Sequence, residues 1–322
     1  MKKCFAGVIA LVMLFTFMFV GVSFAEEKKL SVVTTIFPIY DWVREIVGDI
    51  DNVEITMLLD NGVDLHSYQP TAQDIMKVAT CDMFVYVGGE SDEWVEDALA
   101  EAVNPSMVVI NLLEALGEDI KEEEIVEGME SEEKEEGEEE EEVEYDEHVW
   151  LSLRNARKLV KALAAAIDTA DPANAETYAA NADAYVGKLA ALDADYRTVR
   201  ENADFDTVLF GDRFPFRYLV DDYDLNYYAA FAGCSAESEA SFETIVFLAG
   251  KVDALGLSTV LTIEGDNHRI AETIVGNTQA KGARVLAMDS LQATTGEDVK
   301  NGITYLAAME ANLEVLRQAL TK

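Results

Sequence analysis

Positive charge is scarce in this chain of 322 residues. It has 24 lysine and arginine residues against 62 aspartate and glutamate residues, which gives a formal net charge of -38. Proteins that bind nucleic acid depend on clustered lysine and arginine to neutralise phosphates. The composition therefore argues against a nucleic-acid partner, and the negative field favours cations.

Cysteine is also rare, with three residues in the whole sequence. Cys4 lies in an N-terminal apolar segment, which leaves Cys81 and Cys234 in a processed chain. Two cysteines are too few for a disulfide-rich scaffold, although export would permit one disulfide between them. Both lie in segments that read as strand ends, and we expect two buried free thiols.

The N-terminus has the features of an export signal. Lys2 and Lys3 precede an apolar run over residues 5–22, and Ser23-Phe24-Ala25 supplies small residues at both positions that specify cleavage. We predict that residues 1–25 are removed. The alternative is an uncleaved anchor, since about 18 apolar residues could just span a bilayer. No cysteine directly follows the run, so we expect an exported, periplasmic or extracytoplasmic chain without a lipid anchor.

Short apolar runs alternate with segments of helical period in both halves of the chain. This alternation predicts an α/β fold of two lobes, each a mostly parallel sheet covered by helices. The strands are predicted at 30–36, 53–58, 83–87, 107–110, 207–210, 226–231, 259–264 and 284–287. The helices are predicted near 38–48, 70–79 (with Pro70 in its first turn), 91–102, 214–222, 239–254, 268–279 and 297–319.

An alanine-rich segment over residues 171–203 is predicted to be one long helix that joins the lobes. Asp171 is a natural N-cap and Pro172 suits a first helical turn. Apolar side chains recur along it at spacings of three, four and seven, and they are Tyr178, Tyr185, Leu189, Leu192 and Tyr196. The predicted lobes are therefore 26–170 and 204–322, connected by a stiff helix that restricts hinge opening.

Residues 121–147 contain 16 glutamates. Like charges at this density cannot bury surface, so we predict a disordered acidic loop. It is either a solvating insertion or a weak collector of cations, because carboxylates bind divalent ions loosely. The two interpretations remain open at this point.

The three histidines each lie at a predicted turn. They occur in Asp64-Leu65-His66-Ser67-Tyr68-Gln69-Pro70, in Tyr145-Asp146-Glu147-His148-Val149-Trp150 and in Glu264-Gly265-Asp266-Asn267-His268. Loops beyond the carboxyl ends of parallel strands form the ligand site in open α/β sheets. Imidazole with carboxylate suits zinc, manganese or iron. The three histidines are too far apart in the sequence to form a local metal motif. Each of them, taken alone, is more typical of a structural residue.

Several segments together resemble the zinc and manganese solute-binding proteins of ABC importers (cluster A-I). They are the run over residues 30–38, the His66 and His148 segments, Val85-Tyr86-Val87-Gly88-Gly89-Glu90, the Pro172-initiated helix and Leu286-Ala287-Met288-Asp289-Ser290-Leu291. The resemblance covers essentially the whole mature chain. It implies two α/β lobes, a rigid connecting helix and one metal ion held between the lobes.

The resemblance also implies a ligand set. His66 and His148 match the two ligands of the first lobe, and Asp289 matches the carboxylate ligand of the second. A further family ligand, His or Glu, has no clean counterpart in Gly211-Asp212-Arg213-Phe214, where Asp212 is the nearest able residue. Arg213 would repel a metal unless it pairs with a carboxylate such as Asp212.

Two more residues near the implied site remain as candidates. Glu264 matches a glutamate that often stands close to the metal, as a ligand or as an outer partner. His268 is an additional candidate, with a surface position at a helix start as the alternative.

The implied function is a monomeric extracytoplasmic receptor that captures Zn²⁺, or Mn²⁺ as second choice, as transported ligand. It would deliver the ion to an ABC permease and its ATPase without chemical conversion. An exported zinc hydrolase with Glu264 or Asp289 as base is an alternative, but neither a His-Glu-x-x-His nor a Gly-x-Ser-x-Gly motif is present. A second alternative is an adhesin, acting in cell adhesion, whose metal is structural.

Overall fold

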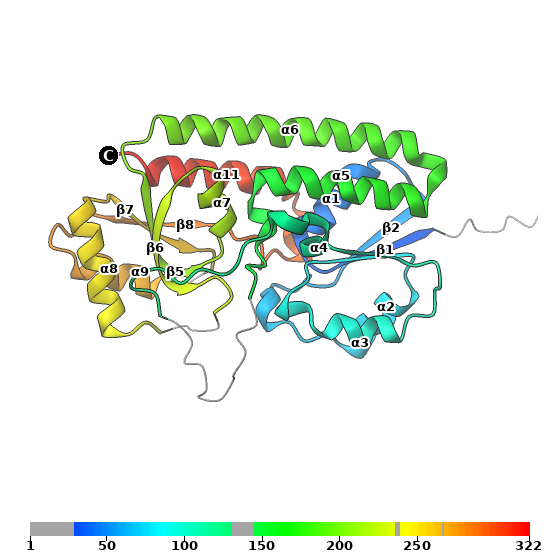
Figure 1. Ribbon diagram of the computed structural model, residues 1–322, viewed down its shortest axis with the longest axis horizontal. Helices are drawn as coiled ribbons and strands as arrows, with labels where there is room; N and C mark the ends of the chain where they lie inside the picture. Colours follow the sequence, from blue (N-terminus) through cyan, green and yellow to red (C-terminus); the bar gives the residue numbers. More distant parts are fainter. Residues whose placement is uncertain (1–28, 131–143, 236–238, 266) are drawn as a thin grey trace, which may run out of the picture.

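The computed structural model describes residues 29–130, 144–235, 239–265 and 267–322. It contains two four-stranded parallel sheets, ordered β2-β1-β3-β4 and β6-β5-β7-β8. Helices cover the sheets, as Figure 1 shows, with the first sheet and its helices at one end of the molecule and the second at the other. The predicted two-lobe α/β class is confirmed.

The first lobe carries the histidine segments on loops between its elements. Its strands are β1 (Leu30–Thr34), β2 (Val53–Met57), β3 (Met83–Tyr86) and β4 (Val108–Asn111). Its α-helices are α1 (Phe37–Val47), α2 (Ala72–Thr80), α3 (Trp94–Ala100), α4 (Leu112–Leu116) and α5 (Leu153–Ala170). The short 3-10 turn η1 (Leu65–Ser67) contains His66, and the turn η4 (Val149–Leu151) begins directly after His148.

The second lobe repeats the alternation of strand and helix. Its strands are β5 (Thr207–Phe214), β6 (Asn226–Ala232), β7 (Thr259–Ile263) and β8 (Arg284–Met288). Its helices are α7 (Arg217–Asp222), α8 (Phe242–Leu255), α9 (Arg269–Asn277), α10 (Gly296–Lys300) and α11 (Tyr305–Ala319). All eight predicted strands are present. Strands such as β3, β5 and β7 are buried at most positions and so produce apolar runs that are easily recognised.

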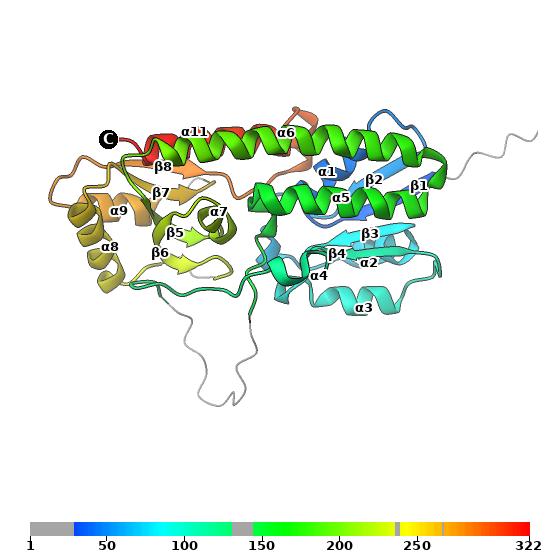
Figure 2. The same ribbon diagram turned by 45° about the horizontal axis from the view of Figure 1, so that its top comes forward.

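One helix, α6 (Ala175–Glu201), runs along both lobes beside α5 and α11 (Figures 1 and 2). Its 27 residues correspond to about 40 Å at 1.5 Å per residue. The predicted apolar stripe is buried throughout. Its start differs from the prediction, because Asp171 and Pro172 open a separate 3-10 turn (Pro172–Asn174) and Asn174 is the N-cap of α6.

One other helix start and one helix interior differ from the prediction. Pro70 lies before α2, because Thr71 and Asp74 form a capping box that starts the helix at Ala72. The predicted helix over 297–319 is two helices, separated at Gly302 (φ 95°) and restarted by the Thr304 cap. Helices α4 and α5 were not predicted.

The prediction that residues 121–147 form one disordered loop is wrong for both of its ends. Glu122 and Tyr145 form an antiparallel bridge, and the Glu130 backbone donates to Ala230 of β6. Ion pairs hold the first arm, with Glu124 on Arg217 at 3.2 Å and Glu127 on Lys251 at 3.0 Å. Residues 131–143 lie outside the described residues.

Three hydrogen bonds join the lobes close to the histidine segments. Asp41 of α1 accepts from the backbone of Tyr305 at 2.7 Å, and the Tyr305 hydroxyl donates to the Trp150 carbonyl at 2.6 Å. Trp150 Nε1 donates to the Ser290 carbonyl at 2.9 Å. The loop after β8 is thereby fixed beside η4.

Residues 1–25, the predicted signal, lie outside the described residues. Among the described residues, none of the helices has the length and apolar character required to cross a membrane.

Candidate metal centre

The two histidines predicted as first-lobe ligands face each other. Their Nε2 atoms are 3.1 Å apart, although 82 residues separate them in the chain. The side chain of His66 is 9% exposed and that of His148 is fully buried. With metal–nitrogen distances of 2.0–2.1 Å, a tetrahedral zinc ion needs about 3.3 Å between two ring nitrogens. The pair is therefore spaced almost as a zinc ion requires.

The remaining nitrogen of each ring is held by a neighbouring side chain. His148 Nδ1 lies 3.1 Å from Asp146 Oδ1, which also accepts from the His148 backbone at 2.8 Å. His66 Nδ1 lies 2.7 Å from Ser91 Oγ and 3.7 Å from Glu147 Oε2. Such outer partners orient an imidazole so that its free nitrogen points to the metal.

Burial and charge act differently on the two rings. Burial, together with the nearby His148, lowers the pKa of His66 to about 3. Burial also tends to lower the pKa of His148, but the Asp146 and Glu147 carboxylates outweigh it and raise the pKa above its ordinary value. His66 is therefore neutral and able to ligate, whereas the neighbouring carboxylates favour the protonated form of His148, which cannot ligate.

Cys234, two residues after the end of β6, is the third residue at this place. Each of His66, His148 and Cys234 offers one ligand atom, and the three atoms lie within 4.8 Å of one another. No other group of three such ligands is found across residues 29–130, 144–235, 239–265 and 267–322. Cys81 and Cys234 are both free, as expected, but only Cys81 is buried. Cys234 was not predicted at the site.

Asp289 and Glu264, the predicted carboxylates of the second lobe, lie outside this three-residue group. Asp289 follows β8, and its Oδ1 accepts from the backbone of Leu291 at 2.8 Å. Glu264 follows β7 and accepts from the backbone and hydroxyl of Ser290 at 2.7 and 2.5 Å. Burial raises the pKa of both carboxyls, and the proximity of Asp289 raises that of Glu264 further.

Asp212 lies in an irregular step of β5 between Phe210 and Arg213. Its Oδ2 accepts from Thr262 and Ile263 of β7 at 2.5 and 3.3 Å. It does not pair with Arg213, whose guanidinium instead bridges to Asp64 of the first lobe at 2.8 Å. That ion pair lies two residues from His66 and neutralises the cation that would otherwise repel a metal.

Gly211, which precedes Asp212, has no room for a side chain. A Cβ at this position would lie 2.5 Å from the Ala271 Cα of α9, so the backbone and helix are in direct contact. His268 lies outside the group formed by His66, His148 and Cys234, and its Nδ1 is 3.4 Å from Thr262 Oγ1.

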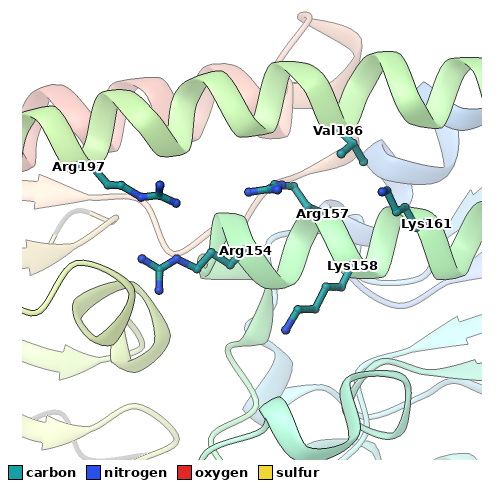
Figure 3. Close-up of a pocket in the computed structure, with 6 residues that line it drawn as sticks. All are labelled: Arg154, Arg157, Lys158, Lys161, Val186 and Arg197. Atoms are coloured by element: carbon teal, nitrogen blue, oxygen red, sulfur yellow. The ribbon is translucent and has the colours of Figure 1, made fainter.

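A basic pocket of about 320 Å³ lies between α5 and α6 (Figure 3). It is lined by Arg154, Arg157, Lys158, Lys161, Val186 and Arg197. Cations of this density repel a metal ion, so this pocket is not the metal centre.

Known proteins resemble the chain over most of its length. It is 31% identical over 302 residues to the high-affinity zinc uptake system protein ZnuA of Bacillus subtilis, covering 93% of this chain and 90% of that protein. It is 28% identical over 297 residues to the zinc-binding protein AdcA of Streptococcus pyogenes, of which it spans only about half (56%).

Solved structures agree in fold. The zinc-bound ZnuA-like domain of AdcA from Streptococcus pneumoniae superposes with a TM-score of 0.71 at 28% identity, covering 91% of this chain and 99% of that domain. The metal-dependent lipoprotein YcdH of Bacillus subtilis superposes with a TM-score of 0.72 at 28% identity, covering 91% of this chain and 99% of that chain. The family model for ZnuA, the periplasmic component A of the zinc-uptake complex, matches residues 32–319, and the chain therefore belongs to the ZnuA family.

Proposed function

We propose that this protein is the extracytoplasmic metal-binding component of an ABC importer, and that its cargo is zinc. The observation that carries the proposal is the buried pair of imidazoles, His66 and His148, with facing nitrogens 3.1 Å apart. Buried histidines are ordinarily satisfied by neighbouring polar groups. Here two ring nitrogens instead meet each other at the spacing of a shared metal ion.

Zinc is the preferred cargo for reasons of ligand chemistry. Imidazole nitrogen suits zinc, whereas manganese prefers oxygen ligands, and affinity order also favours zinc over manganese. The ZnuA and AdcA relatives are named for zinc uptake and zinc binding. Manganese is the second choice.

We assign His66 and His148 as first-lobe ligands and Asp289 as a carboxylate ligand from the second lobe. The oxygens of Asp212 and Glu264 already accept hydrogen bonds from β7 and Ser290. Their role is then to hold the strand ends and the loop that carries Asp289, rather than to bind the ion.

The transport role requires an exported, monomeric chain that docks on a permease with its ATPase. Docking would loosen the contacts between lobes, such as Arg213 with Asp64, and so release the ion. Nothing in this cycle requires catalysis by the binding protein itself.

Calorimetric titration of the metal-stripped protein tests the proposal. We expect one tight zinc site. Loss of a residue that only orients a ligand typically weakens metal binding about 10–100-fold, and His66→Ala and His148→Ala should each weaken zinc binding by more than that. His268→Ala is the matched control and leaves affinity unchanged. A titration without a tight site, or with equal binding in all three variants, contradicts the proposal.

A growth experiment tests the transport step. A strain that lacks the gene is expected to grow poorly when zinc is limiting, and the wild-type gene restores growth. The His66→Ala/His148→Ala double variant does not restore growth, whereas His268→Ala does. Growth restored by the double variant would show that zinc transport does not depend on this site.

A further inference from the structure

The loop that follows β6 brings a sulfur atom to the histidine pair. Cys234 lies in the second lobe, and its Sγ belongs to the group whose ligand atoms are all within 4.8 Å of one another. The chain offers no ligating side chain at Gly211, where α9 packs directly on the backbone. A second-lobe ligand must therefore come from another strand end.

Three consecutive residues fix this loop through contacts with both lobes. Gly233 is in direct contact with His148, because a Cβ there would lie 2.9 Å from the ring Cε1 and 2.9 Å from the Phe214 carbonyl. The Cys234 backbone donates to Glu123 at 3.3 Å. The Ser235 carbonyl accepts from Arg213 at 3.5 Å, and Arg213 also pairs with Asp64. The position of the sulfur is thus fixed by contacts on both sides.

The second cysteine gives a contrast within the same chain. Cys81 is buried at the end of α2, and its thiol donates to the Val78 carbonyl at 3.2 Å. Cys81 does not belong to the ligand group that contains the two histidines. Cys81 therefore behaves as a structural thiol, whereas Cys234 is placed at a centre of ligands.

We propose that Cys234 Sγ is a direct ligand of the captured ion, as a thiolate beside His66 and His148, and that it makes the site selective for zinc over manganese. The proposal rests on the metal-binding function proposed above. As the metal–sulfur bond forms, the S–H bond breaks and its proton leaves to the solvent, so charge balances. Thiolate is a soft ligand that suits zinc, whereas manganese prefers oxygen.

Geometry requires only a small closure of the site. Zinc–sulfur bonds of about 2.3 Å and zinc–nitrogen bonds of about 2.0 Å place sulfur and nitrogen about 3.6 Å apart in a tetrahedron. Since the ligand atoms are now at most 4.8 Å apart, binding would bring the sulfur closer by no more than about 1.2 Å. Asp289 or a water molecule would complete the four positions.

Cobalt substitution tests the sulfur ligand directly. Full-length, metal-stripped protein is titrated with cobalt(II) and its absorption is recorded. We expect one equivalent to produce visible bands of a tetrahedral ion together with a near-ultraviolet thiolate-to-cobalt charge-transfer band. Cys234→Ser loses the charge-transfer band, and Cys81→Ser, the matched control, retains it.

Affinity measurements give the selectivity. Cys234→Ser is expected to weaken zinc binding by at least about tenfold, with a smaller effect on manganese, so that the zinc-to-manganese affinity ratio falls. An unchanged ratio, with wild-type cobalt spectra that lack the charge-transfer band, overturns the sulfur ligand while the His66-dependent site stands. If His66→Ala, with Cys234 intact, left zinc affinity unchanged, the proposed function itself would be contradicted.

X-ray absorption of the zinc-loaded wild-type protein needs no variant, and so remains decisive if Cys234→Ser does not fold. One sulfur scatterer at about 2.3 Å from zinc is expected. A shell of nitrogen and oxygen alone overturns the proposal.

Discussion

At the scale of single residues, the site depends on a carboxylate that orients an imidazole. Asp146 accepts from Nδ1 of His148, so that Nε2 carries the lone pair that faces His66. The identity of both histidines could be predicted from their segments, through the resemblance. Their spacing could not, because it depends on how η1 and η4 approach each other in the folded lobe.

Zinc affinity should depend on pH through His148. Burial alone would lower the pKa of this ring, but the Asp146 carboxylate raises it above its ordinary value. The ring must be neutral to bind the ion. Below that pKa, affinity falls by a further factor of about ten per pH unit, because the His148 proton must leave on binding in addition to the Cys234 thiol proton. Calorimetry over a pH series gives the midpoint.

Asp146→Asn should move this midpoint to lower pH, because the carboxylate that raises the pKa is lost. Affinity at high pH should also fall, by about 10–100-fold, since an outer partner is weakened. Asp51→Asn, at an exposed position, is the control and changes neither quantity. A midpoint that stays in place in Asp146→Asn contradicts the assigned role.

Gly233 should tolerate no side chain. Gly233→Ala places a Cβ against the His148 ring and the Phe214 carbonyl, and such overpacking costs about 1–3 kcal/mol. We expect weaker zinc binding and a lower free energy of unfolding in urea. Gly250→Ala is the control, since nothing lies within 4 Å of a Cβ there and α8 should gain about 0.5–1 kcal/mol. Equal stability of the two variants would contradict the contact.

At the scale of elements, the strands were predictable and several helix limits were not. Strands such as β7 are buried at every position, so their apolar runs stand out in the sequence. The break between α10 and α11 depends on Gly302 and the Thr304 cap, which the apolar period does not reveal. For helix α5 the sequence does carry a signal, in the Ser152 cap and in the helical spacing of Leu159, Leu163 and Ile167.

The contact of α1 with the start of α11 should be sensitive to pH. Burial raises the pKa of Asp41 from its ordinary value to about 6. The folded state thus holds this proton more firmly than the unfolded state, so stability is lost as pH rises from about 4 to 6. The loss is at most about 3 kcal/mol for two pKa units.

Asp41→Asn removes this dependence and keeps an acceptor for the Tyr305 backbone. Relative to the wild type, the variant should be more stable at pH 7 than at pH 4, as measured by urea unfolding. Asp51→Asn again serves as the control. A constant difference between wild type and Asp41→Asn across this range would show that Asp41 is not titrating.

At the scale of the whole molecule, the net charge of -38 acts on the rate of capture. A field of one sign attracts the opposite ion, and salt screens it, since the Debye length falls from about 30 Å at 0.01 M to about 8 Å at 0.15 M. The α/β architecture of each lobe could be predicted from the alternation of strands and helices. The approach of Cys234 to His66 and His148 could not, because it depends on the relative position of the two lobes.

The association rate of zinc should therefore fall by about tenfold between these two salt concentrations, with the dissociation rate nearly constant. Stopped-flow competition with a fluorescent chelator measures both rates. Deleting residues 131–143, while retaining the ordered arm that includes Glu123, should reduce the salt dependence without changing the dissociation rate. An association rate independent of salt would contradict a role for the field.

The most direct test of the central claim is the anomalous scattering of zinc in crystals of the metal-loaded protein. The account predicts one strong peak at about 2.0–2.1 Å from Nε2 of both His66 and His148, with a ligand from the second lobe completing the site. A peak elsewhere, or the two imidazoles still facing each other with no ion between them, would contradict it.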